Sequence, residues 1–483
     1  MTANRRDTDS RISASPASAI DRRTLLRMTG IGAGGTLAAG ALAGRTGLVP
    51  SAAAQDDVTL TIWTPGGTPV FCGMQDDIAT DYEGVNPAVK INEIQCGTGG
   101  ADDFIQVLLG SIAAGNPPDA TLLWQTPVAL GARGALTPLD DLMAASTYAK
   151  AENWPAGLLE TCRYQDKTYG LPVTAGIYGI WYNQDLFDSK GIPSDRASFP
   201  KTWDELRALS KEFTVWDGDT LVSAGFYPFA ALWGTATDTL PIWSALNGGQ
   251  LYDATNRRYT IDTPANIAML EYALAWLDEE YKGDVNLATQ SGQSWGVYAG
   301  EDGPAAFQTG NLAMTQQGSW VMGDLYAEVE PSFTNWNVAP HPVGPGGTTS
   351  VSGSYPNWLV IPDGAAHPTE AFGYLDYLSG VGVSRWYATV PDLPTNLMAP
   401  KVVPQVVVDR RGEAFAEEIT AYFSQQSQVA TPMWNSPVQD FSNDQLKRVL
   451  EQIFLKQVTP AAGLADAQQA SQTELDKLLS GQA

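Results

Sequence analysis

The feature that most constrains this chain is the regular alternation of predicted strands and helices that begins at residue 58. Residues 58–63 alternate apolar and polar side chains, as a half-buried strand does, and the turn Pro65-Gly66-Gly67 separates them from a helical stretch. A second predicted strand, 89–95, leads to another helix, and a third spans 120–124. Strands that alternate with helices form parallel βαβ units, so we expect an α/β fold with mainly parallel sheets.

The N-terminal segment has the order of parts found in an export signal. Arg22-Arg23 precedes a weakly apolar run of Gly, Ala and Leu over 28–44, and Ala52-Ala53-Ala54 is a small-residue cleavage site. The run is too short and too rich in Gly to span a membrane, which requires about 20 strongly apolar residues. Paired arginines, low hydrophobicity and a late positive charge predict a twin-arginine signal peptide. We therefore expect a periplasmic or extracellular protein, and no Cys follows the run for lipid attachment.

Charge and length exclude some classes of function. Without residues 1–54 the chain keeps 21 basic and 50 acidic residues, a net charge of about −29. A surface this acidic repels phosphate backbones and anionic membranes, so we expect no nucleic-acid partner. The 429 residues that remain exceed what one hydrophobic core usually organises, so two lobes are expected.

Three cysteines, Cys72, Cys96 and Cys162, allow one disulfide and one free thiol. Cys72 follows the first predicted strand and Cys96 ends the second, and neighbouring parallel strands bring such ends together. Outside the cytoplasm a disulfide persists, so we predict Cys72–Cys96. Three buried thiols are the alternative, since the sequence shows no geometry.

No catalytic or metal-binding motif stands out in the sequence. Only two histidines occur, His341 and His367, both beside Pro, and neither a zinc cluster nor a Ser-His-Asp set is indicated. The glycines from Gly97 to Gly100 lack the spacing of a dinucleotide loop. A pair of glycosidase carboxylates could be drawn from the many acids, but no local motif singles one out. We expect no catalytic residue, no metal and no cofactor.

Tryptophan is enriched, with 15 residues, and several lie beside Gly and Pro where loops are expected: Trp63, Trp124, Trp233, Trp243, Trp320 and Trp358. Loop aromatics can form binding surfaces. The flat C–H face of a pyranose packs on an aromatic ring, while its hydroxyl groups need short polar partners. This pattern favours a carbohydrate ligand, and core packing is the alternative for any single Trp.

Five segments share their order and spacing with one protein family across most of the chain after residue 55. They are residues 58–64, 112–119 (IAAGNPPD), 169–173 (YGLPV) with 181–183 (WYN), 200–206 (PKTWDEL), and 307–314 (FQTGNLAM) with 318–320 (GSW). Together they resemble family 1 of the extracellular solute-binding proteins, which includes the maltose-binding protein. The fourth segment also contains a predicted capping box, Thr202 with Glu205.

The resemblance implies a two-lobed periplasmic-binding-protein fold of the type II-like class. Each lobe is then a mainly parallel sheet flanked by helices, and crossover hinge strands near Pro172–Tyr178 and Val351–Trp358 join the lobes. The implied boundaries are 1–54 for the signal peptide and disordered N-terminus, 55–174 plus 357–405 for the N-lobe, and 175–356 plus 406–483 for the C-lobe. Ligand is expected in the interlobe cleft, at the C-terminal ends of strands.

Matching positions imply the ligand-binding residues, with Trp320 resembling the stacking Trp of the second lobe. The other candidates lie at strand ends and crossovers: Trp63, Gly66, Gly67, Trp124, Gln125, Gly176, Tyr178, Gly353, Ser354, Tyr355 and Trp358. Asp119 is expected to cap local amides instead of contacting ligand. The sequence lacks an obvious acid at the crossover where maltose-specific members carry one, which argues against malto-oligosaccharides.

The implied function is capture of a sugar or oligosaccharide by a monomer that delivers it to the permease subunits of an ABC importer. Two alternatives belong to other classes of function. One is a secreted carbohydrate-active enzyme, and the other is a binding protein for a non-sugar solute such as glycerol phosphate or a peptide.

Overall fold

The computed structural model describes residues 57–92, 94–97, 101–226, 239–285, 305–327, 333–431 and 434–481. The chain divides into two units, residues 1–54 and 55–483, and the described residues all belong to the second. The predicted signal peptide with Arg22-Arg23, and also Trp233, lie outside the described residues and remain predictions.

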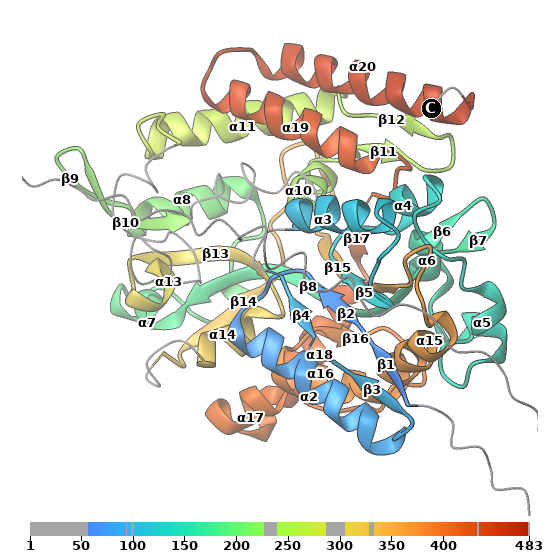
Figure 1. Ribbon diagram of the computed structural model, residues 1–483. Coiled ribbons are helices and arrows are strands. Elements are labelled where there is room, and N and C mark those ends of the chain that lie inside the picture. The colour runs from blue at the N-terminus through green and yellow to red at the C-terminus, as the bar shows by residue number, and fades with distance from the viewer. Residues whose placement is uncertain are drawn as a thin grey trace, which may run out of the picture. The chain divides into compact units, whose positions relative to one another are not determined.

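Eleven strands of the described residues form one mixed sheet in the order β4-β2-β5-β15-β8-β13-β10-β9, with β14 and β16 paired to β8 and β17 to β15 (Figure 1). Their bounds are β2 (Ile62–Thr64), β4 (Gln95–Cys96), β5 (Ala120–Leu123), β8 (Leu171–Asn183), β9 (Val215–Asp217), β10 (Thr220–Phe226), β13 (Leu312–Gly318), β14 (Trp336–Ala339), β15 (Ser352–Val360), β16 (Leu393–Pro394) and β17 (Ala430–Thr431). Three small sheets pair β1 (Val58–Leu60) with β3 (Val89–Ile91), β6 (Arg163–Tyr164) with β7 (Lys167–Thr168), and β11 (Tyr252–Asp253) with β12 (Arg258–Tyr259).

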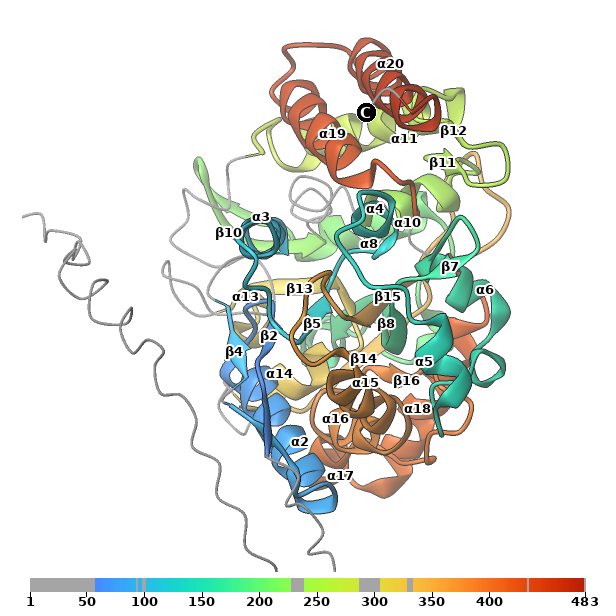
Figure 2. The ribbon, with the colours of Figure 1, turned by 45° about the vertical axis from the view of Figure 1, so that its right-hand side comes forward.

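The α-helices that the structure describes alternate with these strands and then dominate the C-terminal part of the chain. They are α2 (Pro69–Val85), α3 (Ala101–Ala113), α4 (Val128–Ala132), α5 (Asp140–Ala145), α6 (Ala156–Leu159), α7 (Gln184–Ser189), α8 (Trp203–Phe213), α10 (Thr239–Leu246), α11 (Pro264–Glu280), α13 (Ala306–Thr309), α14 (Val321–Ala327), α15 (Pro368–Tyr377), α16 (Val383–Thr389), α17 (Gln405–Arg411), α18 (Glu413–Ser427), α19 (Gln439–Phe454) and α20 (Pro460–Leu479). Both ribbon views show α19 and α20 side by side next to α11 (Figures 1 and 2). Among the described helices, none is long and apolar enough to cross a membrane.

The first predicted strand is two strands in the structure, because the ladder is interrupted at Thr61. The Thr61 N–H donates to Asp119 Oδ2 at 2.9 Å, and Asp119 Oδ1 accepts from the His367 N–H at 2.9 Å. Asp119 thus caps backbone amides, as expected, but these amides belong to segments 58 and 248 residues away and are not local. On one side of the break β1 pairs with β3, and on the other β2 pairs with β4 and β5, all in parallel.

The crossover strands β8 and β15 pair antiparallel at the centre of the sheet. β8, 13 residues long and buried throughout, runs antiparallel to both β15 and β13, whereas β10 and β13 are parallel. The hinge candidate Pro172–Tyr178 lies inside β8, and most of Val351–Trp358 lies inside β15. The two strands pair from Ser354 with Ile177 to Leu359 with Leu171.

Three clusters of buried apolar side chains make up the core. The first core draws on residues 60–173 and 359–390, and it includes Leu60, Leu171 and Trp386. The second core draws on residues 175–339 and 407–475, while the third core gathers side chains of α3, β5, α4 and β15. This division into cores does not test the predicted lobe boundaries. They remain a prediction: 55–174 plus 357–405 for one lobe and 175–356 plus 406–483 for the other.

Two local predictions are confirmed. Cys72 and Cys96 form a disulfide with a Cα–Cα distance of 5.9 Å, and Cys162 is a free, buried thiol whose pKa burial raises to about 12. Thr202 and Glu205 form the capping box of α8: the Thr202 hydroxyl accepts from the Glu205 N–H at 3.3 Å, and the Glu205 carboxylate accepts from the Thr202 N–H at 3.1 Å.

Candidate ligand-binding site

A cavity of about 420 Å³ lies where several chain segments converge on the centre of the main sheet. Its walls come from the loop after β2, the start of α2, the end of β5, the crossovers β8 and β15, the turn after β13, and the segment that follows α16. The lining residues are Gly66, Gly67, Thr68, Phe71, Trp124, Tyr178, Trp320, Tyr355, Asn357, Val390 and Asp392. Open α/β sheets bind ligands at the C-terminal ends of their strands, and β2 and β5 both end at this cavity.

Trp320 occupies a place that two glycines keep open. A Cβ atom at Gly176 would lie 2.2 Å from the Trp320 ring, and one at Gly318 would lie 2.0 Å from it. Such distances exclude any larger residue unless the indole moves. The ring also meets Tyr178 edge-on, with centroids 5.2 Å apart, and it packs against both the first and the second core. Trp320 therefore stands at the junction of the two cores.

A second group of aromatic rings forms the wall that α2 and β5 contribute. The Phe71 ring meets Trp124 and Trp386 edge-on, at centroid distances of 5.9 Å and 5.7 Å. Tyr355 from β15 lies 5.8 Å from Trp320, centroid to centroid. The cavity is therefore bordered by aromatic rings that pack on different cores, with Trp124, Trp320 and Tyr355 each partly exposed.

Asp392 and Asn357 supply the polar part of the lining. Both are buried, with 3 % and 4 % of their surface exposed. Asp392 Oδ2 accepts hydrogen bonds from Asn357 Nδ2 at 3.1 Å and Trp386 Nε1 at 3.2 Å, and Asn357 Nδ2 also donates to Thr174 Oγ1 at 3.0 Å. The other carboxylate oxygen, Oδ1, lies on the side of Gly176. Because two donors hydrogen-bond to Oδ2, the Asp392 carboxylate is held in a single orientation at the cavity.

Six of the candidates predicted from the sequence line the cavity together: Gly66, Gly67, Trp124, Tyr178, Trp320 and Tyr355. Gly176 and Gly353 do not line the cavity, but each contacts a residue that does. Gly176 lies against the Trp320 ring, and a Cβ at Gly353 would lie 3.2 Å from Tyr178. Ser354 pairs with Ile177 between β15 and β8.

The structure places three candidates elsewhere. Trp358 is fully buried in the third core, where its Nε1 donates to Thr161 Oγ1 at 3.4 Å. Trp63 packs against the same core and pairs with Gln95 across β2 and β4. Gln125 is buried beside Trp124 and is not among the lining residues.

The expectation that the flagged tryptophans lie in loops is wrong for three of them. Trp63 is in β2, Trp358 is in β15, and Trp243 is in α10 with its Nε1 donating to Gln316 Oε1 at 2.7 Å. Neighbouring Gly and Pro misled the prediction, because they also occur inside strands and helices where backbones approach closely. The loop placement holds for Trp124 and Trp320, which follow β5 and β13.

Five lining residues were missed: Thr68, Phe71, Asn357, Val390 and Asp392. In the sequence, Phe71 looks like any apolar residue of a helix and Asp392 is one of many acidic residues, so neither could be singled out. Asp392 is an acid that lies near the crossover strand β8 in space, although the crossover sequence itself has no obvious acid. A segment more than 200 residues later brings it there, because β16 pairs with β8 at Leu393 and Ala175.

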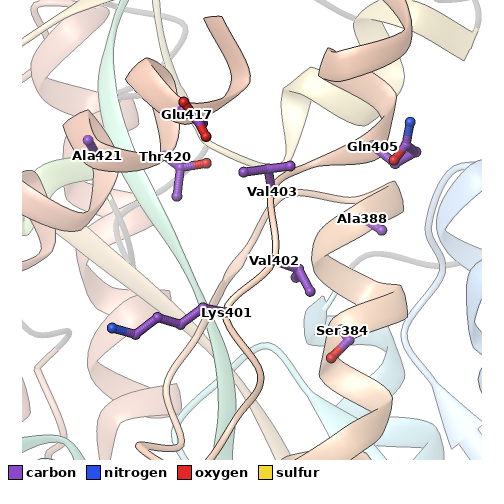
Figure 3. Close-up of a pocket in the computed structure, with 9 residues that line it drawn as sticks. All are labelled: Ser384, Ala388, Lys401, Val402, Val403, Gln405, Glu417, Thr420 and Ala421. Carbon is purple, nitrogen blue, oxygen red and sulfur yellow. The ribbon is translucent and has the colours of Figure 1, made fainter. Parts of the chain in front are cut away.

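A larger hollow elsewhere differs from the cavity in chemistry. It measures about 620 Å³, and Figure 3 shows Val402 and Val403 between α16, which carries Ser384 and Ala388, and α18, which carries Glu417 and Thr420. Its lining contains no aromatic ring: Ser384, Ala388, Lys401, Val402, Val403, Gln405, Glu417, Thr420 and Ala421. Without flat apolar faces it offers little specific contact to a solute, so the aromatic cavity is the better candidate.

Few ionisable groups lie at the cavity among the described residues. No group of three or more His, Cys, Asp or Glu side chains suited to a metal ion occurs among the described residues. His341 is buried, which lowers its pKa to about 3, and neither histidine lines the cavity. Asp392 is the one titratable carboxylate among the lining residues that the structure describes.

Comparison with known proteins places these features in a family. Residues 68–383 match the family described as bacterial extracellular solute-binding protein. An uncharacterized ABC transporter extracellular-binding protein of Pyrococcus horikoshii is 26% identical over 349 residues, covering 70% of this chain and 71% of that protein. A diacetylchitobiose binding protein of Streptomyces coelicolor is 33% identical over 115 residues, covering 23% of this chain and 24% of its own length.

Solved structures share the fold. CpMnBP1 with mannobiose bound superposes with a TM-score of 0.70 at 22% identity, covering 86% of this chain and 99% of that one. The maltose/maltodextrin-binding domain of Bdellovibrio bacteriovorus bound to maltotriose gives a TM-score of 0.66 at 17% identity, covering 87% and 100%. Both comparisons support a two-lobed α/β architecture. Because the family match spans well over half of the chain, the protein belongs to the bacterial extracellular solute-binding protein family.

Proposed function

We propose that this protein captures a sugar, most suitably a short oligosaccharide, in the cavity around Trp320 and delivers it unaltered to the permease of an ABC importer. One observation carries the proposal: aromatic rings from both cores border a cavity whose lining also holds the hydrogen-bonded pair Asp392 and Asn357. Sugar rings pack their C–H faces on aromatic rings, and their hydroxyl groups donate to carboxylates and exchange hydrogen bonds with amides.

The relatives support a carbohydrate ligand. The partial relative from Streptomyces coelicolor is named for diacetylchitobiose, and the two solved structures hold mannobiose and maltotriose. A cavity of about 420 Å³ also falls within the usual range of ligand pockets, about 300–1,000 Å³. These names belong to other proteins, so the identity of the sugar is open to a screen.

A phosphate-bearing ligand is the less suitable alternative. Another structure of this fold, UgpB of Mycobacterium tuberculosis, was solved with glycerophosphocholine, at a TM-score of 0.64 and 17% identity. Phosphate recognition normally uses Arg or Lys side chains. Among the residues lining this cavity there is no Arg or Lys, and Asp392 is acidic.

Capture is coupled to closure in this proposal. The lobes 55–174 plus 357–405 and 175–356 plus 406–483 close about β8 and β15, and a ligand shifts the equilibrium because it touches aromatic rings of both cores at once. Polar contacts also cross the proposed lobe boundary to α19. Thr126 Oγ1, in the loop after β5, donates to Gln439 Oε1 at 3.0 Å, and Arg133 Nη1, directly after α4, lies 3.4 Å from Asp440 Oδ2.

Export completes the proposal. Residues 1–54 act as a twin-arginine signal, and the remaining chain works as a freely diffusing monomer in the periplasm or outside the cell. The Cys72–Cys96 disulfide fits such a compartment, where disulfides persist. The strongly acidic chain stays soluble there through its net charge.

A ligand screen tests the proposal. Residues 55–483 are mixed with mono- and oligosaccharides, including mannobiose, maltotriose and diacetylchitobiose, and the melting temperature is measured. Binding at 100 times Kd stabilises a folded protein by about 2.7 kcal/mol, so a true ligand raises Tm by several degrees. Mass spectrometry then shows the sugar intact after prolonged incubation. Conversion of the sugar would indicate an enzyme, and a panel without any shift would overturn the sugar assignment.

A further inference from the structure

The Cys72–Cys96 disulfide lies against one wall of the ligand cavity. Cys72 follows Phe71 in the first turns of α2, and Cys96 ends β4, the parallel neighbour of β2. The crosslink therefore ties the helix that carries Phe71 to the sheet, at the point where the chain leaves β2 and enters the cavity wall.

Both sulfur atoms touch the loop that forms this wall. Cys72 Sγ lies 3.8 Å from the Gly67 carbonyl oxygen, and Cys96 Sγ lies 3.7 Å from the Pro65 carbonyl oxygen. Gly66 and Gly67, between these contacts, line the cavity. The disulfide thus lies against the backbone of the loop that lines the cavity.

The loop is held from a second direction by Phe71. A Cβ atom at Gly67 would lie 2.5 Å from the Phe71 ring, so the backbone at Gly67 rests on that ring. Two consecutive glycines lose more conformational entropy on ordering than any other pair, and this loop therefore depends on its surroundings for a fixed shape.

We infer that the Cys72–Cys96 disulfide is a positioning element for ligand capture: it holds Gly66, Gly67 and Phe71 in their cavity-lining arrangement, and opening it weakens sugar binding. The inference rests on the proposed sugar-binding function. It assigns the crosslink a role in affinity beyond the general stabilisation that a crosslink between residues 24 apart gives the fold.

The crosslink is open to chemical reduction, because Cys72 and Cys96 are each partly exposed. A dithiol such as dithiothreitol supplies two electrons and two protons; the S–S bond breaks to give two thiols, and the dithiol becomes its cyclic disulfide. Cys162 is fully buried and remains a thiol throughout. A chain that has not yet been oxidised is accordingly expected to capture sugar less tightly than the oxidised protein.

The first experiment needs no ligand. Hydrogen exchange of residues 55–483 is compared between the oxidised protein, the reduced protein and the double variant Cys72→Ala with Cys96→Ala. Backbone amides of residues 64–72 should exchange at least tenfold faster once the crosslink is absent, while α11 and α19 keep their protection. Unchanged exchange at 64–72, or an equal increase in every element, overturns the inference.

The second experiment measures affinity by calorimetry, with mannobiose, maltotriose and diacetylchitobiose as probes. Loss of the crosslink should raise Kd at least tenfold for any probe that binds the oxidised protein. Glu280→Gln is the matched control: this buried carboxylate of the second core accepts from Ser210, Thr214 and Trp276, so its loss lowers Tm without touching the cavity.

The outcomes of the two experiments separate the two proposals. If the double variant and Glu280→Gln have equal melting temperatures and equal affinities, the disulfide is a stabiliser alone and the inference fails. If the oxidised protein binds none of the probes, the sugar assignment fails, and hydrogen exchange still decides whether the disulfide orders the loop.

Discussion

The aromatic side chains at the cavity and those in the cores are the same residue types in different surroundings. Trp124, Trp320 and Tyr355 are partly exposed, and Trp320 touches both the first and the second core. Trp358 and Trp276 are fully buried, each within a single core. Identity alone therefore does not separate a binding residue from a packing residue.

The difference comes from the backbone around each ring. Trp320 packs against Gly176 and Gly318, where the missing side chains leave room for its ring, and the ring stays partly exposed at the cavity. Trp358 lies in β15 between β5 and β8, opposite Leu123 and Pro172, so strands enclose it on both sides. The ring at the cavity therefore has glycines as neighbours, whereas the ring in the core lies between two strands.

The sharpest test of this contrast is Trp358→Ala. Removing a fully buried Trp leaves a cavity in the third core, and we expect the free energy of unfolding to fall by about 3–5 kcal/mol. The affinity of the folded protein for its ligand should stay within about twofold. Urea unfolding measures the first quantity and calorimetry the second; a large loss of affinity at unchanged stability would move Trp358 into the site.

Two buried acids offer a matched pair on the polar side. Asp392→Asn removes the charged acceptor from the cavity, and ligand affinity should fall by about 1.5–3 kcal/mol, roughly tenfold to a hundredfold. Asp119→Asn, which disturbs only the cap on Thr61 and His367, should lower stability and leave affinity unchanged. Calorimetry on both variants decides, and equal affinities would contradict the assignment of Asp392.

Acid should destabilise the fold through the buried His341, which does not line the cavity. Burial lowers the pKa of His341 to about 3 from 6.5, so the unfolded chain takes up a proton below pH 6.5 that the folded chain does not. Stability contributed by this residue is complete above pH 6.5 and falls by about 1.4 kcal/mol per pH unit toward pH 3, roughly 2 kcal/mol at pH 5. His341→Leu should flatten this part of the urea-unfolding profile. An identical pH slope in the variant would refute the assignment.

The smallest expected effect belongs to Trp320→Ala. Loss of a stacking ring should weaken binding by about 1 kcal/mol or somewhat more, with a small change in stability because the ring is partly exposed. Trp320→Phe should recover part of the affinity. Fluorescence titration gives Kd and urea unfolding gives stability; lower stability with unchanged Kd would make Trp320 a packing residue like Trp358.

Much of the fold was predictable because its signals are local. The strand and helix alternation after residue 58, the capping box at Thr202 and the pairing of Cys72 with Cys96 each follow from neighbouring residues or from strand order, and the structure confirms them. The break at Thr61 was not predictable, because its cause is the carboxylate of Asp119, 58 residues away.

The site was predictable only where a motif reached it. Trp320 and the Gly66-Gly67 loop lie within or beside segments that resemble the family, and all three line the cavity. Trp358 matched a crossover position equally well and is buried, because in a strand alternate side chains point to opposite faces. The sequence could not show which face of β15 belongs to the cavity.

The sequence by itself determined an acidic α/β chain with the motifs of a solute-binding family, and it predicts an export signal at the N-terminus. The tertiary structure decided which residues meet at the ligand. Phe71 is more than 280 residues from Asn357 and Asp392 in the sequence. The three residues share a cavity because β16 and β15 pair with β8 while the disulfide holds α2 against the sheet. Local sequence patterns predict helices and strands, whereas contacts between distant segments form only when the helices and strands pack together.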